Sequence, residues 1–288
     1  MPRQAYVNGR YLPHARAAVH IEDRGYQFAD GVYEVVPVYN GILVDEDPHL
    51  DRLERSLGEL GIAMPMERRA LKLVSRELMR RNDLSNGFLY LQVTRGVAPR
   101  DHKFPDRSVP PALVMTTRQM KPHSDQVLNE GLKVITLPDI RWARCDIKTV
   151  SLLPNVLAKQ QAVEAGAYEA WQVDPEGRVT EGTSSNAWIV TTDGKVVTRD
   201  AGQAILSGIT RLSLIELIRE EGLTLEERAF TVEEAKAAKE AFLTSSTSYL
   251  LPVTRIDETT VGNGHPGLLY SKLREHYLAY MDGLGDPA

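Results

Sequence analysis

The order of apolar and polar positions along the chain predicts short strands and amphipathic helices. The apolar run Val32–Tyr39, the pair Asn40–Gly41 and the run Ile42–Val44 predict a β-hairpin, because Asn and Gly both tolerate the positive φ angles of a tight turn. Four leucines at helical spacing follow between Pro48 and Gly61, and this pattern predicts a helix with one apolar face. The first third of the chain is therefore expected to be α+β.

The remaining elements mix strands and helices in an irregular order. In the first half we expect a helix at 67–81 and strands at Phe88–Thr94 and Ala112–Thr117. In the second half the pattern predicts strands at Leu132–Leu137, Tyr168–Val173, Ala187–Val190, Lys195–Thr198 and Ala241–Thr244, and helices at Asn155–Ala165, at Thr210–Glu221, after Thr231 and near Pro266. The lack of strict alternation favours two α+β domains over a doubly wound sheet.

The length of 288 residues also suits two domains better than a single core. The polar segment 121–126, which contains Pro122, is the expected linker. We therefore predict an N-terminal α+β domain at 1–120 and a C-terminal α+β domain at 127–288.

Composition and charge exclude several classes of function. A hydrophobic content of 42% and a charged content of 25% are typical of a soluble globular protein, and a net charge of -5 gives no electrostatic reason to bind nucleic acid or an anionic membrane. No apolar run is long enough to cross a bilayer, no signal peptide is evident, and Cys145 is the only cysteine, so we expect a cytoplasmic protein. The histidines show no metal-ligand spacing and no glycine-rich nucleotide motif is present, so no metal is expected.

The candidate chemistry begins with a lysine and an acidic residue. Lys148 ends the segment Arg144–Lys148, and Glu181 opens a loop of small polar residues that ends at Asn186. An amine that forms a Schiff base and a carboxylate that keeps a pyridine nitrogen protonated are what a pyridoxal phosphate enzyme takes from its protein. Taken singly, each residue is more often a solvated surface charge, so the hypothesis depends on the surrounding motifs.

Such a cofactor requires a phosphate anchor, and Ser207–Arg211 is the first candidate. There a loop enters a predicted helix, Gly208 lets the backbone approach an anion, and Thr210 adds a hydroxyl donor. A plain helix cap is the alternative, and on this segment alone it is the commoner case. Ser245–Ser248 is a second group of donors, with a polar turn as its alternative. Arg52 lies opposite the leucine stripe of its helix, where it faces either solvent or a cleft.

The loop Thr94–Pro105 follows a predicted strand and is bounded by prolines. Arg100 and His102 lie two residues apart in it, so in an extended segment their side chains point the same way. A guanidinium and an imidazole together are suited to bind a carboxylate, for which arginine offers a bidentate fork. A basic surface loop is the alternative.

Together these segments resemble the fold-type IV pyridoxal phosphate enzymes and, among them, the D-amino acid aminotransferases. The resemblance covers most of the chain. Its matching stretches are Glu22–Val36, Thr94–Pro105, Asp139–Trp142, Arg144–Lys148, Thr180–Asn186, Ile205–Arg211 and Thr244–Ser248.

The resemblance implies roles for individual residues. Lys148 matches the Schiff-base lysine, which also moves the substrate proton, and Glu181 matches the partner of the pyridine nitrogen. The other positions that match contacts to pyridoxal 5'-phosphate are Arg52, Ser185, Leu206, Gly208, Ile209, Thr210, Ser246 and Thr247. Tyr33, Arg100 and His102 match a trap for the substrate carboxylate, and Trp142 matches an aromatic residue near the cofactor, with an ordinary core position as its alternative. In the family the Arg and His come from the neighbouring subunit, which implies a homodimer with shared active sites.

The implied reaction moves the amino group of a D-amino acid such as D-alanine to a 2-oxo acid such as 2-oxoglutarate or pyruvate. Branched-chain L-amino acid aminotransferases are the nearest alternative, but they carry a Tyr five residues after the lysine, where this chain has Leu153. Aminodeoxychorismate lyases, (R)-amine transaminases and a cofactor-binding protein without transaminase activity remain further alternatives. Neither nucleic acid nor a membrane is an expected partner.

Overall fold

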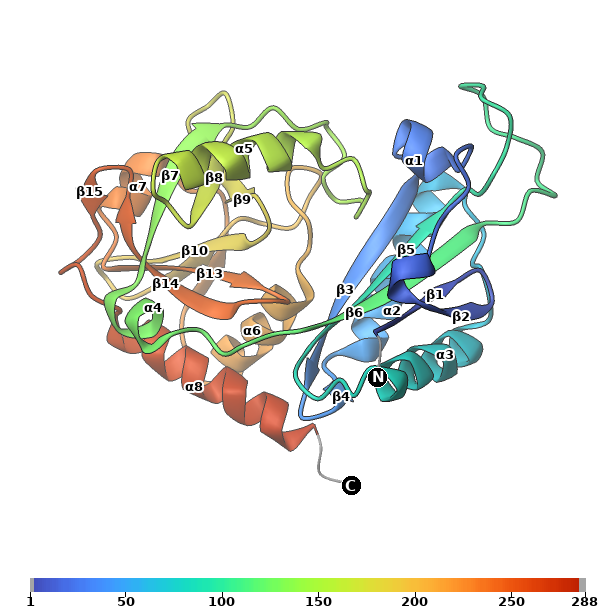
Figure 1. Ribbon diagram of the computed structural model, residues 1–288. Coiled ribbons are helices and arrows are strands. Elements are labelled where there is room, and N and C mark those ends of the chain that lie inside the picture. The colour runs from blue at the N-terminus through green and yellow to red at the C-terminus, as the bar shows by residue number, and fades with distance from the viewer. Residues whose placement is uncertain (1–2, 285–288) are drawn as a thin grey trace. The chain divides into compact units, whose positions relative to one another are not determined.

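The computed structural model describes residues 3–284 and divides the chain into two compact units (Figure 1). Unit 1 extends to Lys121 and also includes Ile147–Ser151. Unit 2 comprises Pro122–Asp146 and the chain from Leu152 onward. A short internal segment of the chain therefore returns to the first unit.

A six-stranded antiparallel sheet forms the centre of unit 1, in the order β2-β1-β6-β5-β3-β4. Its strands are β1 (Gln4–Val7), β2 (Arg10–Pro13), β3 (Gly31–Tyr39), β4 (Ile42–Leu43), β5 (Gly87–Thr94) and β6 (Ala112–Gln119). The helices of this unit are the 3-10 helix η1 (His14–Arg16), α1 (Arg24–Phe28), α2 (Glu46–Leu60) and α3 (Arg68–Arg81).

The predicted hairpin and the first predicted helices are confirmed. Strands β3 and β4 pair across Asn40 and Gly41, whose φ angles are 49° and 80°. Helix α2 begins at Glu46, before Pro48, and ends as predicted at Gly61, where a φ of 62° closes the helix in the left-handed region.

Helices α2 and α3 supply the apolar side chains that cover one face of this sheet. Val32, Val36 and Val38 of β3 pack there with leucines of both helices. Tyr33 and Val35 lie on the other face and are half-buried, because successive side chains of a strand point to opposite faces. This alternation decides which side chains of β3 remain available for chemistry.

The segment Ile147–Ser151 packs against the beginning of β3. The backbone N–H of Tyr33 donates to the Lys148 carbonyl at 3.0 Å, and that of Val150 donates to the Gly31 carbonyl at 3.1 Å. The sequence places this segment inside a domain at 127–288, whereas the structure groups it with unit 1. The reason is that its backbone hydrogen bonds are made with β3.

A nine-stranded mixed sheet forms the centre of unit 2, in the order β12-β11-β10-β13-β14-β7-β8-β9, with β15 paired to β14. Its strands are β7 (Leu132–Pro138), β8 (Glu169–Val173), β9 (Val179–Gly182), β10 (Asn186–Val190), β11 (Val196–Thr198), β12 (Leu225–Glu227), β13 (Glu240–Ser245), β14 (Tyr249–Ile256) and β15 (Thr259–Thr260). The strands predicted in this half are confirmed. Strands β9, β12, β14 and β15 are additions that the sequence pattern does not predict, and β14 contains Pro252.

The helices of unit 2 are α4 (Asp125–Glu130), α5 (Leu153–Glu164), α6 (Ile209–Glu220), α7 (Val232–Lys236) and α8 (Leu268–Gly283). Helix α5 lies along β7 and β8, while α6 and α8 contact each other and β13 (Figure 1). The predicted capping box is present at α7, where the Thr231 side chain accepts from the Glu234 N–H. No helix within residues 3–284 combines the length and apolar character needed to cross a membrane.

Candidate active site

Lys148 lies against the half-buried face of β3 in unit 1. Its carbonyl accepts from the Tyr33 N–H at 3.0 Å, and its own N–H donates to the Ser56 hydroxyl at 3.4 Å. Its Nζ atom lies 4.2 Å from the centroid of the Tyr33 ring. The structure therefore brings together the predicted reactive lysine and one member of the predicted carboxylate trap.

A second tyrosine continues this face. The rings of Tyr33 and Tyr90 lie 5.7 Å apart, and the Tyr90 hydroxyl donates to the Gln92 side chain at 2.7 Å. Burial, with a smaller effect of Tyr33, raises the pKa of Tyr90 to about 12. The Tyr90 hydroxyl therefore stays protonated at neutral pH.

A buried carboxylate lies on the opposite, helix-covered face of β3. Glu34 is fully buried and accepts hydrogen bonds from Nε and Nη2 of Arg52, both at 2.8 Å. Its other contact is the Nδ1 atom of His49 at 2.7 Å. Arg52 is only 8% exposed, so the alternative of a solvated helix face is wrong. The reason is that a buried carboxylate needs a paired charge, and Arg52 supplies it.

Burial acts on both titratable partners of this cluster. Burial alone would raise the pKa of Glu34, but the charge and hydrogen bonds of Arg52 outweigh it and hold that pKa well below its usual value. For His49 burial prevails over the hydrogen bond with Glu34, so its pKa is lowered. At neutral pH the cluster therefore holds an ionised carboxylate and a neutral imidazole whose Nδ1 donates to it.

The predicted loop between β5 and β6 is confirmed, and both of its candidate residues lie on its surface. Arg100 and His102 are exposed. The Arg100 guanidinium lies 4.9 Å from the centroid of the Phe28 ring, and the His102 ring lies 5.5 Å from the same ring. The two side chains do converge, as their spacing predicts. In the described part of unit 1, however, their ring contacts are with Phe28 and not with Tyr33.

Unit 2 holds Glu181 in a fixed position near the end of β9. One carboxylate oxygen is bound by Nη1 of Arg141. The other accepts from the Asn186 side-chain amide and from the Leu206 N–H, both at 3.1 Å. Glu181 is 7% exposed. These contacts orient a negative charge beside Leu206, another predicted cofactor residue.

Asp139 fixes Arg141 from the other side. It accepts from Arg141 Nε at 2.9 Å and from Nη2 at 2.6 Å, while Nη2 also donates to the Ala204 carbonyl at 3.0 Å. Burial opposes the charge of Arg141, but Asp139 and Glu181 outweigh it, and the pKa of Arg141 lies above its ordinary value. Burial likewise opposes the charge of Asp139, and Arg141 lowers its pKa. Asp139 and Glu181 therefore hold Arg141 between them by hydrogen bonds.

Asn186 connects this network to the start of helix α6. Its amide donates to the Leu206 carbonyl at 3.0 Å as well as to Glu181. A Cβ atom at Gly208 would lie 2.1 Å from Asn186 Oδ1, so only glycine fits there without moving the amide. Gly208 is also the N-cap of α6 and has no side chain to occupy the N–H groups of the first turn.

The remaining candidates of unit 2 lie at the start of α6 and in the turn between β13 and β14. Ile209 and Thr210 are buried in the first turn of α6. Ser246 and Thr247 are half-buried in the turn between β13 and β14, and their proposed contact with a phosphate stays a prediction. Strand β13 runs into that turn and pairs with β10 at Asn186. Asn186 also donates to the Leu206 carbonyl just before α6. Strand β10 therefore positions both the turn and the start of α6.

Ser185, which the resemblance places beside the cofactor, binds a buried carboxylate of its own unit. Its hydroxyl donates to Glu169, which is 1% exposed. Glu169 also accepts from the Thr183 hydroxyl at 2.8 Å and from the N–H and hydroxyl of Ser184 at 2.8 and 2.9 Å. Glu169 therefore fixes the loop between Glu181 and Asn186.

Two further residues that the sequence analysis singles out, Trp142 and Leu153, are exposed in unit 2. Trp142 is 45% exposed, so its alternative as an ordinary core residue is wrong. Leu153, the position that separates this chain from the branched-chain pattern, is the first residue of α5 and is 68% exposed.

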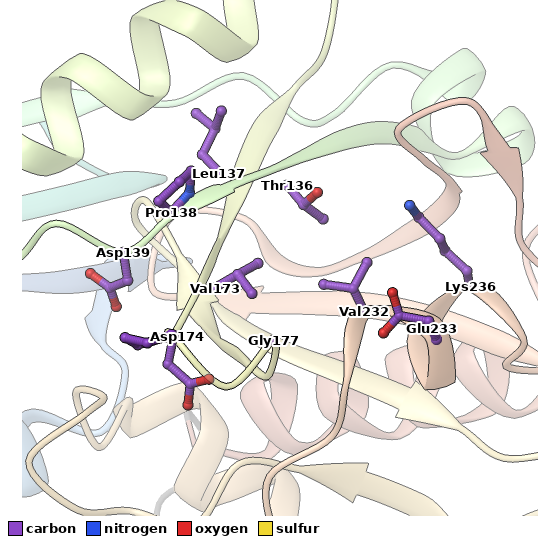
Figure 2. Close-up of a pocket in the computed structure, with 11 residues that line it drawn as sticks. Thr136, Leu137, Pro138, Asp139, Val173, Asp174, Gly177, Val232, Glu233 and Lys236 are labelled. Carbon is purple, nitrogen blue, oxygen red and sulfur yellow. The ribbon is translucent and has the colours of Figure 1, made fainter.

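A cavity of about 540 Å³ lies elsewhere in unit 2, between β7, β8 and α7 (Figure 2). It is lined by Thr136, Leu137, Pro138, Asp139, Val173, Asp174, Pro175, Gly177, Val232, Glu233 and Lys236. None of the predicted site residues is among them. Asp139 belongs to both this cavity and the Glu181 network, whereas Lys236 is paired with Asp257 at 2.7 Å. In the described part of the chain, no group of three acidic, His or Cys side chains is placed to hold a metal ion.

Several residues of the site were given no role from the sequence. Glu34 carries a recognisable signal, because it is a charge among the apolar residues of a strand face. Arg141 and Asp139 lie in a matching stretch without a role, and Glu169 lies in a predicted strand. For these three no local pattern indicates their partners.

Comparison with known proteins supports the family resemblance that the sequence motifs indicate. The model of the amino-transferase class IV family matches residues 31–256. A D-alanine aminotransferase of Bacillus licheniformis is 46% identical over 91% of this chain and 91% of its own length, and one of Staphylococcus haemolyticus is 39% identical over 97% and 98%.

Solved structures show the same fold. A branched-chain amino acid aminotransferase of T.th., solved with pyridoxamine 5'-phosphate, is 25% identical and superposes with a TM-score of 0.90 over 98% of this chain and 95% of that chain. The enzyme of Escherichia coli, at 20% identity, shares the fold with a TM-score of 0.87 over 97% and 94%. The predicted resemblance and fold class are confirmed: this chain belongs to the class IV aminotransferases and has their two-part α+β fold.

Proposed function

We propose that this protein is a pyridoxal phosphate-dependent aminotransferase that moves the amino group of a D-amino acid, of the D-alanine type, to a 2-oxo acid such as 2-oxoglutarate or pyruvate. The observation that carries the proposal is the Glu181 carboxylate, held by Arg141, Asn186 and Leu206, in a chain that also presents the Lys148 amine beside Tyr33. The two D-alanine aminotransferases, at 46% and 39% identity, support the choice of substrate.

The residues of both units fit pyridoxal 5'-phosphate. Lys148 supplies a primary amine, Glu181 an anion for a protonated ring nitrogen, and the first turn of α6 uncapped N–H groups for a phosphate. Arg52, Ser246 and Thr247 are proposed as further phosphate contacts, Ile209 and Thr210 as residues of the anchoring turn, and Leu206 and Ser185 as neighbours of the ring. When bound, the cofactor serves as an electron sink for a carbanion at the substrate Cα.

The chain's own residues then divide the work. With the cofactor bound, the Lys148 amine would be the base that takes the proton from the substrate Cα and the acid that gives it up again on the same face. Glu181 keeps the ring nitrogen protonated. Tyr33, Arg100 and His102 hold the α-carboxylate, and because Lys148 works from one face, the position of that carboxylate decides which enantiomer reacts.

Arg100 and His102 are proposed to act in the active site of a second copy of the chain. Both side chains are exposed, and within their own unit they contact Phe28. A homodimer in which each loop completes the partner's trap would explain why basic side chains are presented on the surface. We also propose a cytoplasmic location, which the lone Cys145 favours.

The test of this function is the half-reaction of the purified, cofactor-loaded protein with D-alanine, L-leucine and (R)-1-phenylethylamine in separate cuvettes. We expect D-alanine alone to bleach the visible absorption of the bound cofactor. Bleaching by L-leucine instead would assign the protein to the branched-chain group despite Leu153. A response to the amine only, or to none of the three, would contradict the proposal.

Arg100→Ala tests the carboxylate trap. We expect the KM for D-alanine to rise by about 100-fold, which corresponds to the loss of one charged hydrogen-bonding partner, while the cofactor absorbance stays intact. Arg107→Ala is the matched control, because Arg107 is an exposed arginine of the same loop. An unchanged KM in the Arg100 variant would remove this residue from the trap.

A further inference from the structure

The loop that carries Arg100 is fastened to helix α1 by a buried arginine. Arg24 is 3% exposed, donates to the Asp30 carboxylate at 2.8 Å and donates to the Asp101 carbonyl, between Arg100 and His102, at 2.6 Å. Asp30 also accepts from Arg95 at the base of the loop at 2.7 and 3.0 Å. The Asp30 carboxylate therefore connects Arg95, at the base of the loop, with Arg24, which binds the middle of the loop at Asp101.

Phe28, the last residue of α1, lies within reach of three cationic or aromatic groups. Its ring centroid is 4.8 Å from the Arg24 guanidinium, 4.9 Å from the Arg100 guanidinium and 5.5 Å from the His102 ring. Contact of a guanidinium with an aromatic face is worth about 0.5–1 kcal/mol at an exposed site. The ring thus restricts two otherwise exposed side chains of the loop without occupying their hydrogen-bond donors.

We propose that Phe28 is the positioning residue of the carboxylate trap, holding Arg100 and His102 side by side before the substrate arrives. This inference rests on the proposed function, in which both residues bind the α-carboxylate. An arginine on a mobile loop loses rotamer freedom when it binds, and a ring that already restricts it lowers that cost. Phe28 makes no contact with the reacting atoms in this proposal, so it acts on substrate affinity and not on proton transfer.

The geometry also explains why an aromatic residue is needed. Asp30 pairs with Arg24 as well as with Arg95, so it reduces the repulsion between Arg24 and Arg100 at the Phe28 ring without cancelling it. A leucine at this position is also apolar but has no ring face for a guanidinium. A tyrosine keeps the ring.

The experiment compares Phe28→Leu, Phe28→Tyr and the control Tyr26→Leu in the full-length, cofactor-loaded protein. Tyr26 lies on the same short helix and is 76% exposed. We expect Phe28→Leu to raise the KM for D-alanine and the Ki of propionate, which is D-alanine without its amino group, by about 5- to 10-fold each, as fits the loss of roughly 1 kcal/mol. The kcat and the cofactor absorbance should not change, and Phe28→Tyr and Tyr26→Leu should behave like the original protein.

Other outcomes would overturn the inference in distinguishable ways. If Arg100→Ala raises the KM and Phe28→Leu does not, the trap stands and the role of Phe28 is refuted. If Phe28→Leu lowers kcat, absorbance and melting temperature together, and Phe28→Tyr does not restore propionate binding, the residue is structural only. If the unaltered protein does not convert D-alanine, the proposed function fails and the inference falls with it.

Discussion

Each unit contains a buried arginine–carboxylate pair that includes a predicted cofactor residue, and the two pairs are buried in opposite order. In unit 1 the carboxylate of Glu34 is 0% exposed and Arg52 is 8% exposed. In unit 2 the side chain of Arg141 is 6% exposed and the side chain of Glu181 is 9% exposed. Their other partners agree with this order, since His49 contacts Glu34 whereas Asp139 contacts Arg141. In unit 1 His49 Nδ1 lies 2.7 Å from Glu34 and 3.5 Å from Arg52 Nη2, so its shorter contact is with the more deeply buried member.

This difference shows how the same pair of residue types can present either a cation or an anion. Glu34 orients Arg52 from within the core of unit 1, and in the proposed function the arginine is the group that would meet a phosphate. Arg141, fixed by Asp139, orients Glu181, and in the same proposal the carboxylate is the group that would meet a ring nitrogen. Removing the orienting residue, Glu34 or Arg141, should lower the free energy of unfolding or misalign its partner. Removing the presented residue, Arg52 or Glu181, should impair cofactor binding or the rate of the reaction.

The largest effect is expected when Glu34 is changed to Gln. The substitution leaves the buried Arg52 without its counter-charge, and breaking such a pair costs about 3–5 kcal/mol. All three tryptophans, Trp142, Trp171 and Trp188, lie in unit 2, so their fluorescence follows that unit in urea while tyrosine circular dichroism also reports unit 1.

We expect the tyrosine transition of the Glu34→Gln variant to move to lower urea while the tryptophan transition stays. Glu77→Gln, which alters a surface ion pair on α3, is the control and should move neither. Equal movement of both transitions would show that the units unfold as one, and no movement would refute the structural role of Glu34.

The next effect is expected from Glu181→Gln, which removes the presented anion and keeps its shape. We expect kcat for D-alanine to fall by about 100- to 1000-fold, the range for losing one preorganised electrostatic partner. The urea transition should move less than in Glu34→Gln, because Arg141 keeps the Asp139 carboxylate as its counter-charge. A normal kcat would mean that Glu181 does not control the ring nitrogen, and the comparison between the pairs would lose its basis.

Arg141→Met should have a smaller effect than the change of Glu181 itself. The apolar side chain retains volume but releases Glu181 from one of its partners, and partners of this kind in metal sites are worth about 10- to 100-fold. We expect cofactor affinity and kcat to fall within that range, with a shift of the absorption maximum of the bound cofactor as the spectroscopic check. An effect as large as that of Glu181→Gln would show that Arg141 is more than a positioning residue.

The two pairs also differ in how much of them the sequence predicts. The Asn40–Gly41 hairpin, the helix that ends at Gly61 and the residues Lys148 and Glu181 are all readable from local patterns or from the resemblance. Glu34 and Arg52 lie 18 residues apart and need the hairpin and the helix that follows it to be packed before they meet. Arg141 and Glu181 lie 40 residues apart, and the order β7-β8-β9 brings them together.

Long-range packing also explains why the sequence places Ile147–Ser151 in the C-terminal domain while the structure groups it with unit 1. The local pattern around Lys148 contains no boundary signal, because the segment joins unit 1 through backbone hydrogen bonds to Gly31 and Tyr33. Backbone donors and acceptors are the same in every residue, so their partners cannot be read from side-chain types. The sequence therefore singles out Lys148 as a candidate but does not show which unit holds it.

The smallest effect is expected from pH, and it concerns the pair in unit 1. The pKa of His49 is lowered from 6.5 by burial, while the charges of Arg52 and Lys148 also oppose its protonation and Glu34 favours it. Below pH 6.5 the unfolded chain therefore binds a proton that the folded chain does not, and the free energy of unfolding falls as the pH falls. The slope from one such group is at most about 1.4 kcal/mol per pH unit.

We expect the tyrosine transition in urea to move to lower urea between about pH 7 and pH 5.5, and His49→Gln to remove this part of the slope. Glu34 stays ionised throughout this window, because its pKa lies well below its usual value. His14→Gln, at an exposed histidine of the same unit, is the control. If His49→Gln leaves the slope unchanged, His49 is charged when folded, and the Glu34 carboxylate then orients two cations where the geometry assigns it one.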